Sequence, residues 1–162
     1  MSITERLRDC TVKIVSPNSS IWGTGFFVGY QTILTCYHVV KSCQPEAIDL
    51  QRNRKAWKIA RLLKVVHRPV DLALLHVDVE KESHPPCVLL GTELDDRALV
   101  SLYGYPDELP EGSPCSGEFE GLASKDGIDL IQFKAGNVRP GHSGSPLLNE
   151  KTSQVCGVVR IS

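Results

Sequence analysis

Short runs of β-branched, apolar and aromatic residues, each bounded by turn residues, constrain the fold of this chain more than any other feature. Only the first residues depart from this pattern. Ser2, followed three positions later by Glu5, fits a capping box and predicts a short helix over residues 3–9 that packs Ile3 and Leu7 inward. The later runs lie at residues 11–16, 23–30, 32–36, 47–51, 55–65, 71–77, 98–105, 116–124, 128–133, 145–149 and 154–161. The sequence therefore predicts an all-β protein with one short N-terminal helix.

The series of runs is interrupted near its middle. Residues 81–97 contain Pro85, Pro86, Gly91 and two adjacent aspartates, a composition typical of a connection between two folded units. After this segment the runs resume, with Asp126-Gly127 placed as a hairpin turn. We therefore expect one domain over residues 1–162 built of two antiparallel β-barrels, the first over 10–80, the connector over 81–97 and the second over 98–162.

The charge balance gives no reason to expect a nucleic-acid or membrane partner. Lysine and arginine total 18 against 19 acidic residues, so the formal net charge is -1. Segment 52–64 carries several basic residues around Trp57, but alternation along a strand explains them as a solvated face. The N-terminus lacks a secretion signal, and no apolar run approaches the roughly 18 residues of a membrane span. These features predict a cytoplasmic protein.

The cysteine pattern argues against disulfides, metals and cofactors. There are six cysteines, and in a cytoplasmic chain they are expected to remain free thiols that pack as small core residues. The sequence contains no C-x-x-C or H-x-x-x-H pair with which a zinc site begins. We expect no metal ion and no cofactor.

A turn of small residues, Arg139-Pro140-Gly141-His142-Ser143-Gly144-Ser145-Pro146, has the features of a nucleophile site. A nucleophilic serine needs an exposed hydroxyl and neighbouring backbone N–H groups that converge on the oxyanion of a tetrahedral intermediate. Glycine at position 141 permits the backbone conformation that this requires. Ser143 is therefore the candidate nucleophile, and the N–H groups of Gly141 and Ser143 are the candidate oxyanion donors.

The candidate base is His38, which follows the apolar run at residues 32–36 and begins a small turn. The other four histidines fit less well. His67 lies in a predicted loop, His76 within a strand and His84 in the connector. His142 neighbours the serine but is expected to point away from it. Asp71 opens the apolar run at 71–77, where a carboxylate at the core edge needs a partner such as an imidazole N–H. Asp78, its rival, lies at the exposed end of that run.

Chain order separates the serine-hydrolase architectures. The candidates occur in the order His38, Asp71, Ser143, which is the order of the chymotrypsin type. No histidine follows Ser143, which excludes the α/β-hydrolase order, and only Asp9, in the predicted helix, precedes His38 as the subtilisin order would require.

At these residues the sequence resembles the trypsin-like serine peptidases, in particular HtrA-type and other bacterial intracellular members. The resemblance is carried by three blocks, GTGFFVGYQTILTCYHVV at 23–40, DLALLHV at 71–77 and GHSGSPLLN at 141–149. It implies a chymotrypsin-like fold and a serine endopeptidase that cleaves protein or peptide substrates through an acyl-enzyme. It also implies that the substrate pocket is bordered by Asn137, Val138, Arg139, Pro140, Arg160, Ile161 and Ser162, with Arg160 able to favour an acidic substrate side chain.

Three departures from the family pattern bear on regulation. His142 occupies the position where secreted members carry an aspartate that pairs with a trimmed N-terminus, which argues against activation by trimming. Ser145 stands where HtrA-type members have glycine. Family members continue beyond the strand that resembles residues 154–162, so the second barrel is expected to be truncated.

Two alternative functions remain open at this point. The first is a catalytically inactive pseudopeptidase that binds proteins or peptides in the groove between the barrels. The second modifies the enzyme hypothesis: the domain is the effector of a larger regulated protein, held inactive until a sensor region of the same polypeptide changes state.

Overall fold

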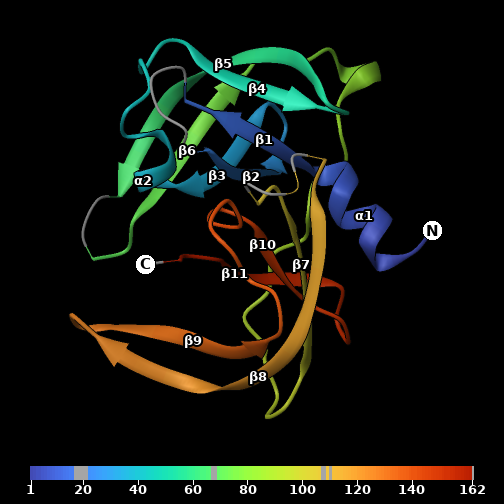
Figure 1. Cartoon of the computed structure of the whole chain (residues 1–162), viewed down its shortest axis with the longest axis vertical. Coiled ribbons are helices and arrows are strands. Elements are labelled where there is room, and N and C mark those ends of the chain that lie inside the picture. Colours follow the sequence, from blue (N-terminus) through green and yellow to red (C-terminus); the bar gives the residue numbers. More distant parts are fainter. Residues whose placement is uncertain (17–21, 67–68, 107–108, 110, 162) are drawn as a thin grey trace.

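Antiparallel strands dominate the computed structural model, which describes the chain except residues 17–21, 67–68, 107–108, 110 and 162 (Figure 1). The elements in chain order are α1 (Ile3–Cys10), β1 (Thr11–Val15), β2 (Trp22–Gly29), β3 (Thr32–Cys36), α2 (Tyr37–Val40), β4 (Ile48–Arg52), β5 (Lys55–Val66), β6 (Leu72–Val77), the 3-10 turn η1 (Lys81–Ser83), β7 (Leu99–Gly104), β8 (Ser113–Lys125), β9 (Ile128–Ala135), β10 (Pro146–Asn149) and β11 (Gln154–Val158).

The first unit is a closed barrel with strand order β1-β2-β3-β6-β5-β4. Alternate residues of its strands point inward, as the period of two requires. The interior is filled by side chains with no exposed surface, such as Val12, Ile14, Phe27, Ile33 and Leu75. Burial of this kind, at roughly 25 cal/mol per Å² of apolar surface, stabilises the barrel whose rim carries α2.

The second unit is an open five-stranded antiparallel sheet in the order β11-β10-β7-β8-β9. It curves into a half-barrel around Val100, Leu102, Cys115, Leu147 and Val159. The long β8–β9 hairpin extends away from the rest of the molecule (Figure 1). The predicted chymotrypsin-like fold with a short N-terminal helix is confirmed, with the second barrel present as a half-barrel.

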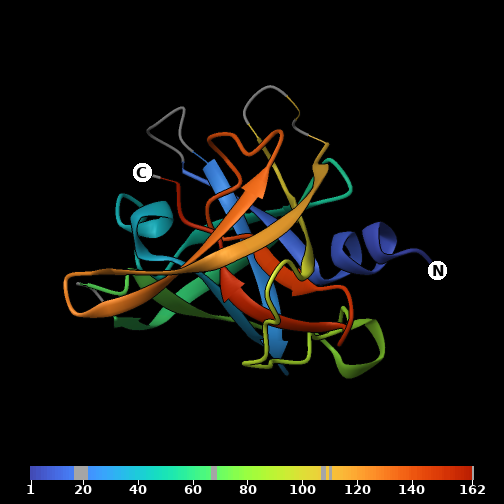
Figure 2. The same cartoon turned by 90° about the horizontal axis from the view of Figure 1, so that it is seen from below.

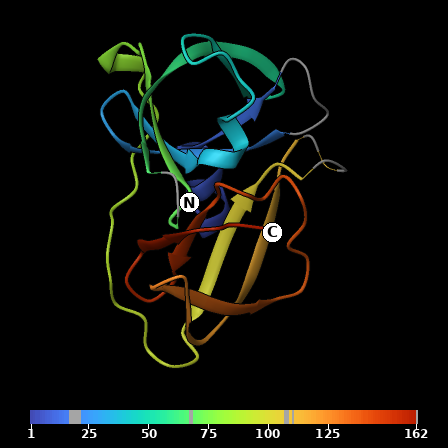
Figure 3. The same ribbon diagram turned by 90° about the vertical axis from the view of Figure 1, so that its left-hand side faces the viewer.

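The two units stack along the long axis of the molecule, and the connector runs down one side of both (Figure 3). The connector forms backbone hydrogen bonds with each unit, from Val88 N–H to the Phe27 carbonyl (2.9 Å) and from Gly91 N–H to the Val155 carbonyl (3.0 Å). The boundaries expected from the sequence, with the connector at 81–97, stay a prediction.

A shared apolar cluster joins the units. Its buried members come from α1, β2, the second sheet and the residue that follows β7, and they are Leu7, Phe26, Tyr103, Tyr105, Leu148 and Val155. Helix α1 begins where the sequence predicts, since Ser2 Oγ accepts the Glu5 N–H at 3.1 Å. The helix projects to one side in the view from below (Figure 2). Because α1 contributes Leu7 to this cluster, it helps to hold the two units together.

Two further observations complete the fold. All six cysteines are free thiols. In the described part of the chain, no helix has both the length and the apolar character needed to cross a membrane.

Candidate active site

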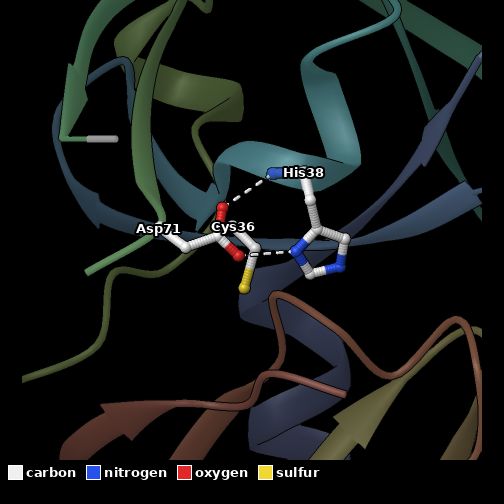
Figure 4. Close-up of side chains that lie close together, drawn as sticks. All are labelled: Cys36, His38 and Asp71. Atoms are coloured by element: carbon white, nitrogen blue, oxygen red, sulfur yellow. Dashed lines mark hydrogen bonds and ion pairs between the residues drawn. The ribbon is translucent and has the colours of Figure 1, made fainter. Parts of the chain in front are cut away.

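His38 and Asp71 form a doubly hydrogen-bonded pair at the rim of the first barrel (Figure 4). His38 Nδ1 lies 2.6 Å from one carboxylate oxygen, and the His38 backbone N–H donates to the other at 2.9 Å. The His38 side chain is 37% exposed and that of Asp71 only 18%. A carboxylate at Nδ1 favours the tautomer that carries its proton there, which leaves the Nε2 lone pair available as a base.

The backbone around Asp71 explains how the sequence creates this pair. Asp71 has φ +59°, a left-handed conformation in which aspartate is enriched among non-glycine residues. In this conformation its carbonyl accepts the Tyr37 N–H at 3.2 Å while its side chain accepts the His38 N–H. The residue therefore satisfies two N–H groups at the start of α2, the helix that carries His38.

Ser143 lies in the second of two consecutive turns that share His142. His142 N–H donates to the Arg139 carbonyl and Ser145 N–H donates to the His142 carbonyl, each at 3.0 Å. The third residue of each turn is a glycine with positive φ, +95° at Gly141 and +91° at Gly144. Because the second residues, Pro140 and Ser143, are not left-handed, both are type II turns, which require a glycine-like third residue.

These turns leave two backbone donors available. Gly144 N–H donates to the Val159 carbonyl at 2.8 Å, but the N–H groups of Gly141 and Ser143 have no acceptor among the residues that the structure describes. They are the two groups predicted from the sequence as oxyanion donors. A developing negative charge placed between such donors would be stabilised.

Thr24 of β2 ties the serine turn to the first barrel. Its backbone N–H donates to the Ser143 carbonyl (2.9 Å), and its hydroxyl donates to the Gly141 carbonyl (2.9 Å) while accepting the Tyr105 N–H (3.0 Å). Thr24 is fully buried. The first barrel therefore holds both residues that carry the candidate oxyanion donors.

Neighbouring contacts place Ser143 beside the segment that carries His38. A methyl group built on Gly23 would lie 2.7 Å from the Val39 side chain and 3.1 Å from the Ser143 carbonyl oxygen. The Ser143 hydroxyl itself accepts the Ile161 N–H at 3.1 Å, and within the described residues no hydrogen bond joins it to His38. The structure thus pairs His38 with Asp71 and brings Ser143 alongside, with the hydroxyl directed to the C-terminal segment.

Cys36 lies next to the His38–Asp71 pair (Figure 4). One ligand atom from each of these three residues falls within 4.8 Å of the others. The thiol, however, donates to the Val159 carbonyl at 3.3 Å, and burial together with the Asp71 charge raises its pKa to about 12. A metal would require the thiolate and would have to separate the His38–Asp71 hydrogen bond. The contacts favour a hydrogen-bonded pair over a metal centre.

The family model for the trypsin-like peptidase domain matches residues 23–158. The chain belongs to the trypsin-like peptidase family. Two solved structures are similar to this peptidase domain over nearly all of its length. The inactive form of the Rv3671c protease matches at 25% identity with a TM-score of 0.78, covering 96% of this chain and 78% of the other. Deg5 matches at 22% identity with a TM-score of 0.79, covering 98% and 82%.

A third similar structure is a mutant of Rv3671c from M. tuberculosis H37Rv in its inactive form, with 24% identity, a TM-score of 0.78 and coverage of 96% and 76%. At these identities the likeness of this mutant and of Deg5 bears on the fold alone. The order of barrels and connector in this peptidase domain is therefore that of known proteases.

The residues expected at the substrate pocket of this peptidase domain are divided by the structure. Val138 and Ile161 pack against the half-barrel core, whereas Asn137 and Pro140 are exposed. Exposed Arg160 directs its guanidinium to the Pro69 carbonyl at 3.4 Å, so the charge expected to select acidic substrates is engaged at the edge of the first barrel. Arg139 contributes its backbone to the first turn, and Ser162 lies outside the described residues.

Sequence reasoning missed three contributors to the site: Thr24, Cys36 and the main chain of Ile161. Thr24 had a detectable signal, because a polar residue between two glycines in an apolar strand suggests a buried hydroxyl at a close backbone approach. The role of Cys36 depends on its contact with Val159 and that of Ile161 on its contact with Ser143, and no local pattern indicates either contact.

Proposed function

We propose that the chain is a serine endopeptidase in which Ser143 is the nucleophile, His38 the base and Asp71 the group that orients the base. The observation that carries the proposal is the His38 Nδ1–Asp71 pair beside a serine turn with two available backbone donors. Protein or peptide substrates follow from the family. The cytoplasmic location expected from the sequence stays a prediction.

The reaction begins when the Ser143 hydroxyl rotates from Ile161 toward His38 Nε2. The oxygen attacks the peptide carbonyl as its proton passes to Nε2, and the carbonyl oxygen becomes an oxyanion bound by the Gly141 and Ser143 N–H groups. The C–N bond then breaks, and the leaving amine takes the proton from His38. Water, deprotonated by the same imidazole, cleaves the ester on Ser143 and restores the hydroxyl. Asp71 stays ionised and stabilises the imidazolium.

A fluorophosphonate probe tests this assignment, because it phosphonylates only a serine activated by its base and oxyanion donors. Labelling should map to Ser143 and should be lost in Ser143→Ala, which should also lower peptide hydrolysis by about 10⁶. Ser145→Ala is the matched control, since it removes a neighbouring hydroxyl that has no hydrogen-bond partner in the described part of the chain. Labelling at Ser145 would assign the nucleophile to that residue instead, and no labelling of either the wild type or a folded variant that lacks the Ile161 N–H donor would favour the pseudopeptidase alternative.

The Ile161 contact supports a second element of the proposal, that the domain is a regulated effector whose resting state engages its own nucleophile. The N–H of Ile161 occupies the lone pair of Ser143 Oγ at 3.1 Å, so a sensor region that moved this segment would release the hydroxyl. Ile161→Pro lacks this donor and should label faster than Ile161→Val, which keeps it. Equal rates in two folded variants would remove this support for regulation.

A further inference from the structure

His142 is almost fully buried, with 1% of its surface exposed, yet it takes no part in the proposed proton transfers. Its Cδ2 atom faces β7, where a methyl group on Gly104 would approach to within 2.8 Å. Burying an imidazole costs free energy unless its polar atoms find partners, and among the described residues Nδ1 has a hydrogen-bond partner whereas the buried Nε2 has none. The partners of this ring therefore indicate what it does.

Two hydrogen bonds of His142 go to the same residue. Its Nδ1 atom accepts the Arg139 backbone N–H at 3.0 Å, and its own backbone N–H donates to the Arg139 carbonyl at 3.0 Å. The side chain thus closes the Arg139–His142 turn a second time. An Nδ1 atom that accepts a hydrogen bond requires the neutral imidazole with its proton on Nε2.

The form of this turn decides where the Gly141 N–H points. Types I and II differ by a rotation of the central peptide, here that between Pro140 and Gly141, through roughly 180°. Proline at the second position is compatible with either type, so this residue alone does not choose between them. The rotated peptide would turn the Gly141 N–H away from that of Ser143. Contacts at both ends of the turn therefore control the oxyanion donors.

We propose that His142 is a positioning residue for catalysis: its neutral imidazole, by accepting the Arg139 N–H, holds the Arg139–His142 turn in the type II form that aims the Gly141 and Ser143 N–H groups into one volume. This inference rests on the proposed function, since it assigns these N–H groups to an oxyanion. Protonation of His142 removes the acceptor and releases the turn.

The surroundings of the imidazole favour the neutral form. Burial lowers the pKa of His142, the Arg139 charge lowers it further, and backbone groups of Ser113 and Arg139 offset part of the effect. The atoms that Gly104 faces alongside the ring belong to the uncharged residues Thr24 and Ser145. Because the folded-state pKa lies below the usual value of 6.5, the unfolded chain takes up the proton first, and stability falls as the pH drops below that value.

The test combines two variants with measurements of acylation and of the imidazole itself. His142→Asn keeps an acceptor oxygen near the position of Nδ1 but does not titrate, whereas His142→Leu fills the space with no acceptor. With the fluorophosphonate probe, His142→Leu should acylate about 10²–10³-fold more slowly, the loss expected when an oxyanion donor is misplaced. His142→Asn should stay within about tenfold of the wild type.

The pH profile separates this role from a structural one. Acylation by the wild type should fall more steeply on the acid side than acylation by His142→Asn, because only the wild type loses the Nδ1 acceptor when His142 takes up a proton. His76→Asn, which removes a histidine of β6, should keep the wild-type profile. Wild-type acylation by a folded His142→Leu, or identical acid limbs in the wild type and His142→Asn, would overturn the proposal.

A measurement independent of activity distinguishes the two proposals. Nitrogen-15 NMR of the imidazole should show Nδ1 unprotonated at neutral pH, and the Arg139 amide should exchange slowly in the wild type and His142→Asn but rapidly in His142→Leu. If the wild type fails to react with the probe while these signals are as expected, the proposed function fails and the positioning contact stands. A protonated Nδ1 in a reactive wild type would overturn the positioning role and leave the proposed function in place.

Discussion

At the scale of single residues, the hydrogen bonds of Asp71 require a carboxylate, which an amide of the same size cannot replace. Both of its oxygens accept hydrogen bonds, one from the His38 backbone and one from Nδ1. In Asp71→Asn the single oxygen would remain on the backbone N–H, and the amide NH₂ would face Nδ1. That nitrogen would then have to accept, which moves the imidazole proton to Nε2, the atom that must take the proton of Ser143.

Asp71→Asn should therefore lower kcat by about 10⁴ while the domain stays folded. Steady-state hydrolysis of a peptide ester, with circular dichroism to verify the fold, measures this. Asp78→Asn is the matched control, because Asp78 also bonds a histidine, His76, at 2.9 Å but has a side chain that is 95% exposed. Similar losses in both variants would mean that Asp71 acts through general charge rather than through the His38 tautomer.

At the scale of elements, one histidine adds to the attachment of the connector to the first barrel. His84 Nε2 accepts the Gln31 N–H at 2.8 Å, and its ring packs against Phe27 and Tyr30 with centroids 4.8 and 5.1 Å away. Nδ1 lies 2.6 Å from the Pro85 carbonyl. The imidazole thus fixes the β2–β3 turn, where Gln31 has φ +58°, to the start of the connector.

His84→Ala should lower the free energy of unfolding by about 1–3 kcal/mol, because it leaves the Gln31 N–H without its acceptor and removes a ring from the apolar contact. Urea denaturation followed by tryptophan fluorescence measures the change. The acylation rate should stay close to that of the wild type, since the hydrogen bonds of His84 go to Gln31 and Pro85 rather than to the serine turn. A large loss of acylation with unchanged stability would contradict this assignment.

The elements also show how far sequence patterns reach. The sequence pattern predicts both ends of β3 correctly and the end of β5 to within one residue, because the side chains of these strands face either the barrel core or solvent. The sequence predicts a strand over 154–161, but β11 stops at Val158. Val159 instead exchanges hydrogen bonds with Gly144 and Ser145. That termination is set by the serine turn, a tertiary contact that local alternation does not encode.

The whole molecule assembles its candidate site from segments that are separated by most of the chain. Chain order and turn chemistry select His38, Asp71 and Ser143 as candidates, because the proline and glycines that predict the serine turn are visible in the local sequence. The contact of Ile161 with Ser143 is not predictable in this way because it depends on how the second unit folds back on itself, and the contact of Arg160 with Pro69 depends on how the two units dock. Among the polar groups through which the units dock, the Thr24 hydroxyl bonds two segments of the second unit at once.

Replacing this hydroxyl tests whether docking of the barrels and alignment of the oxyanion donors are coupled. Thr24→Val keeps the shape of the side chain but leaves the Gly141 carbonyl and the Tyr105 N–H without their partner, so unfolding free energy should fall by about 1–3 kcal/mol. Acylation should fall by at least about tenfold at temperatures where the variant is fully folded, because Gly141, whose N–H is a candidate oxyanion donor, loses the hydrogen bond that holds its carbonyl. Thr24→Ser, which retains the hydroxyl, should keep most of the activity.

Thr35→Val is the stability control. The Thr35 hydroxyl donates to the Thr24 carbonyl at 2.7 Å, so this variant should lose stability with a smaller loss of acylation. If the two valine variants lose acylation in proportion to stability alone, the barrels dock without controlling the donors.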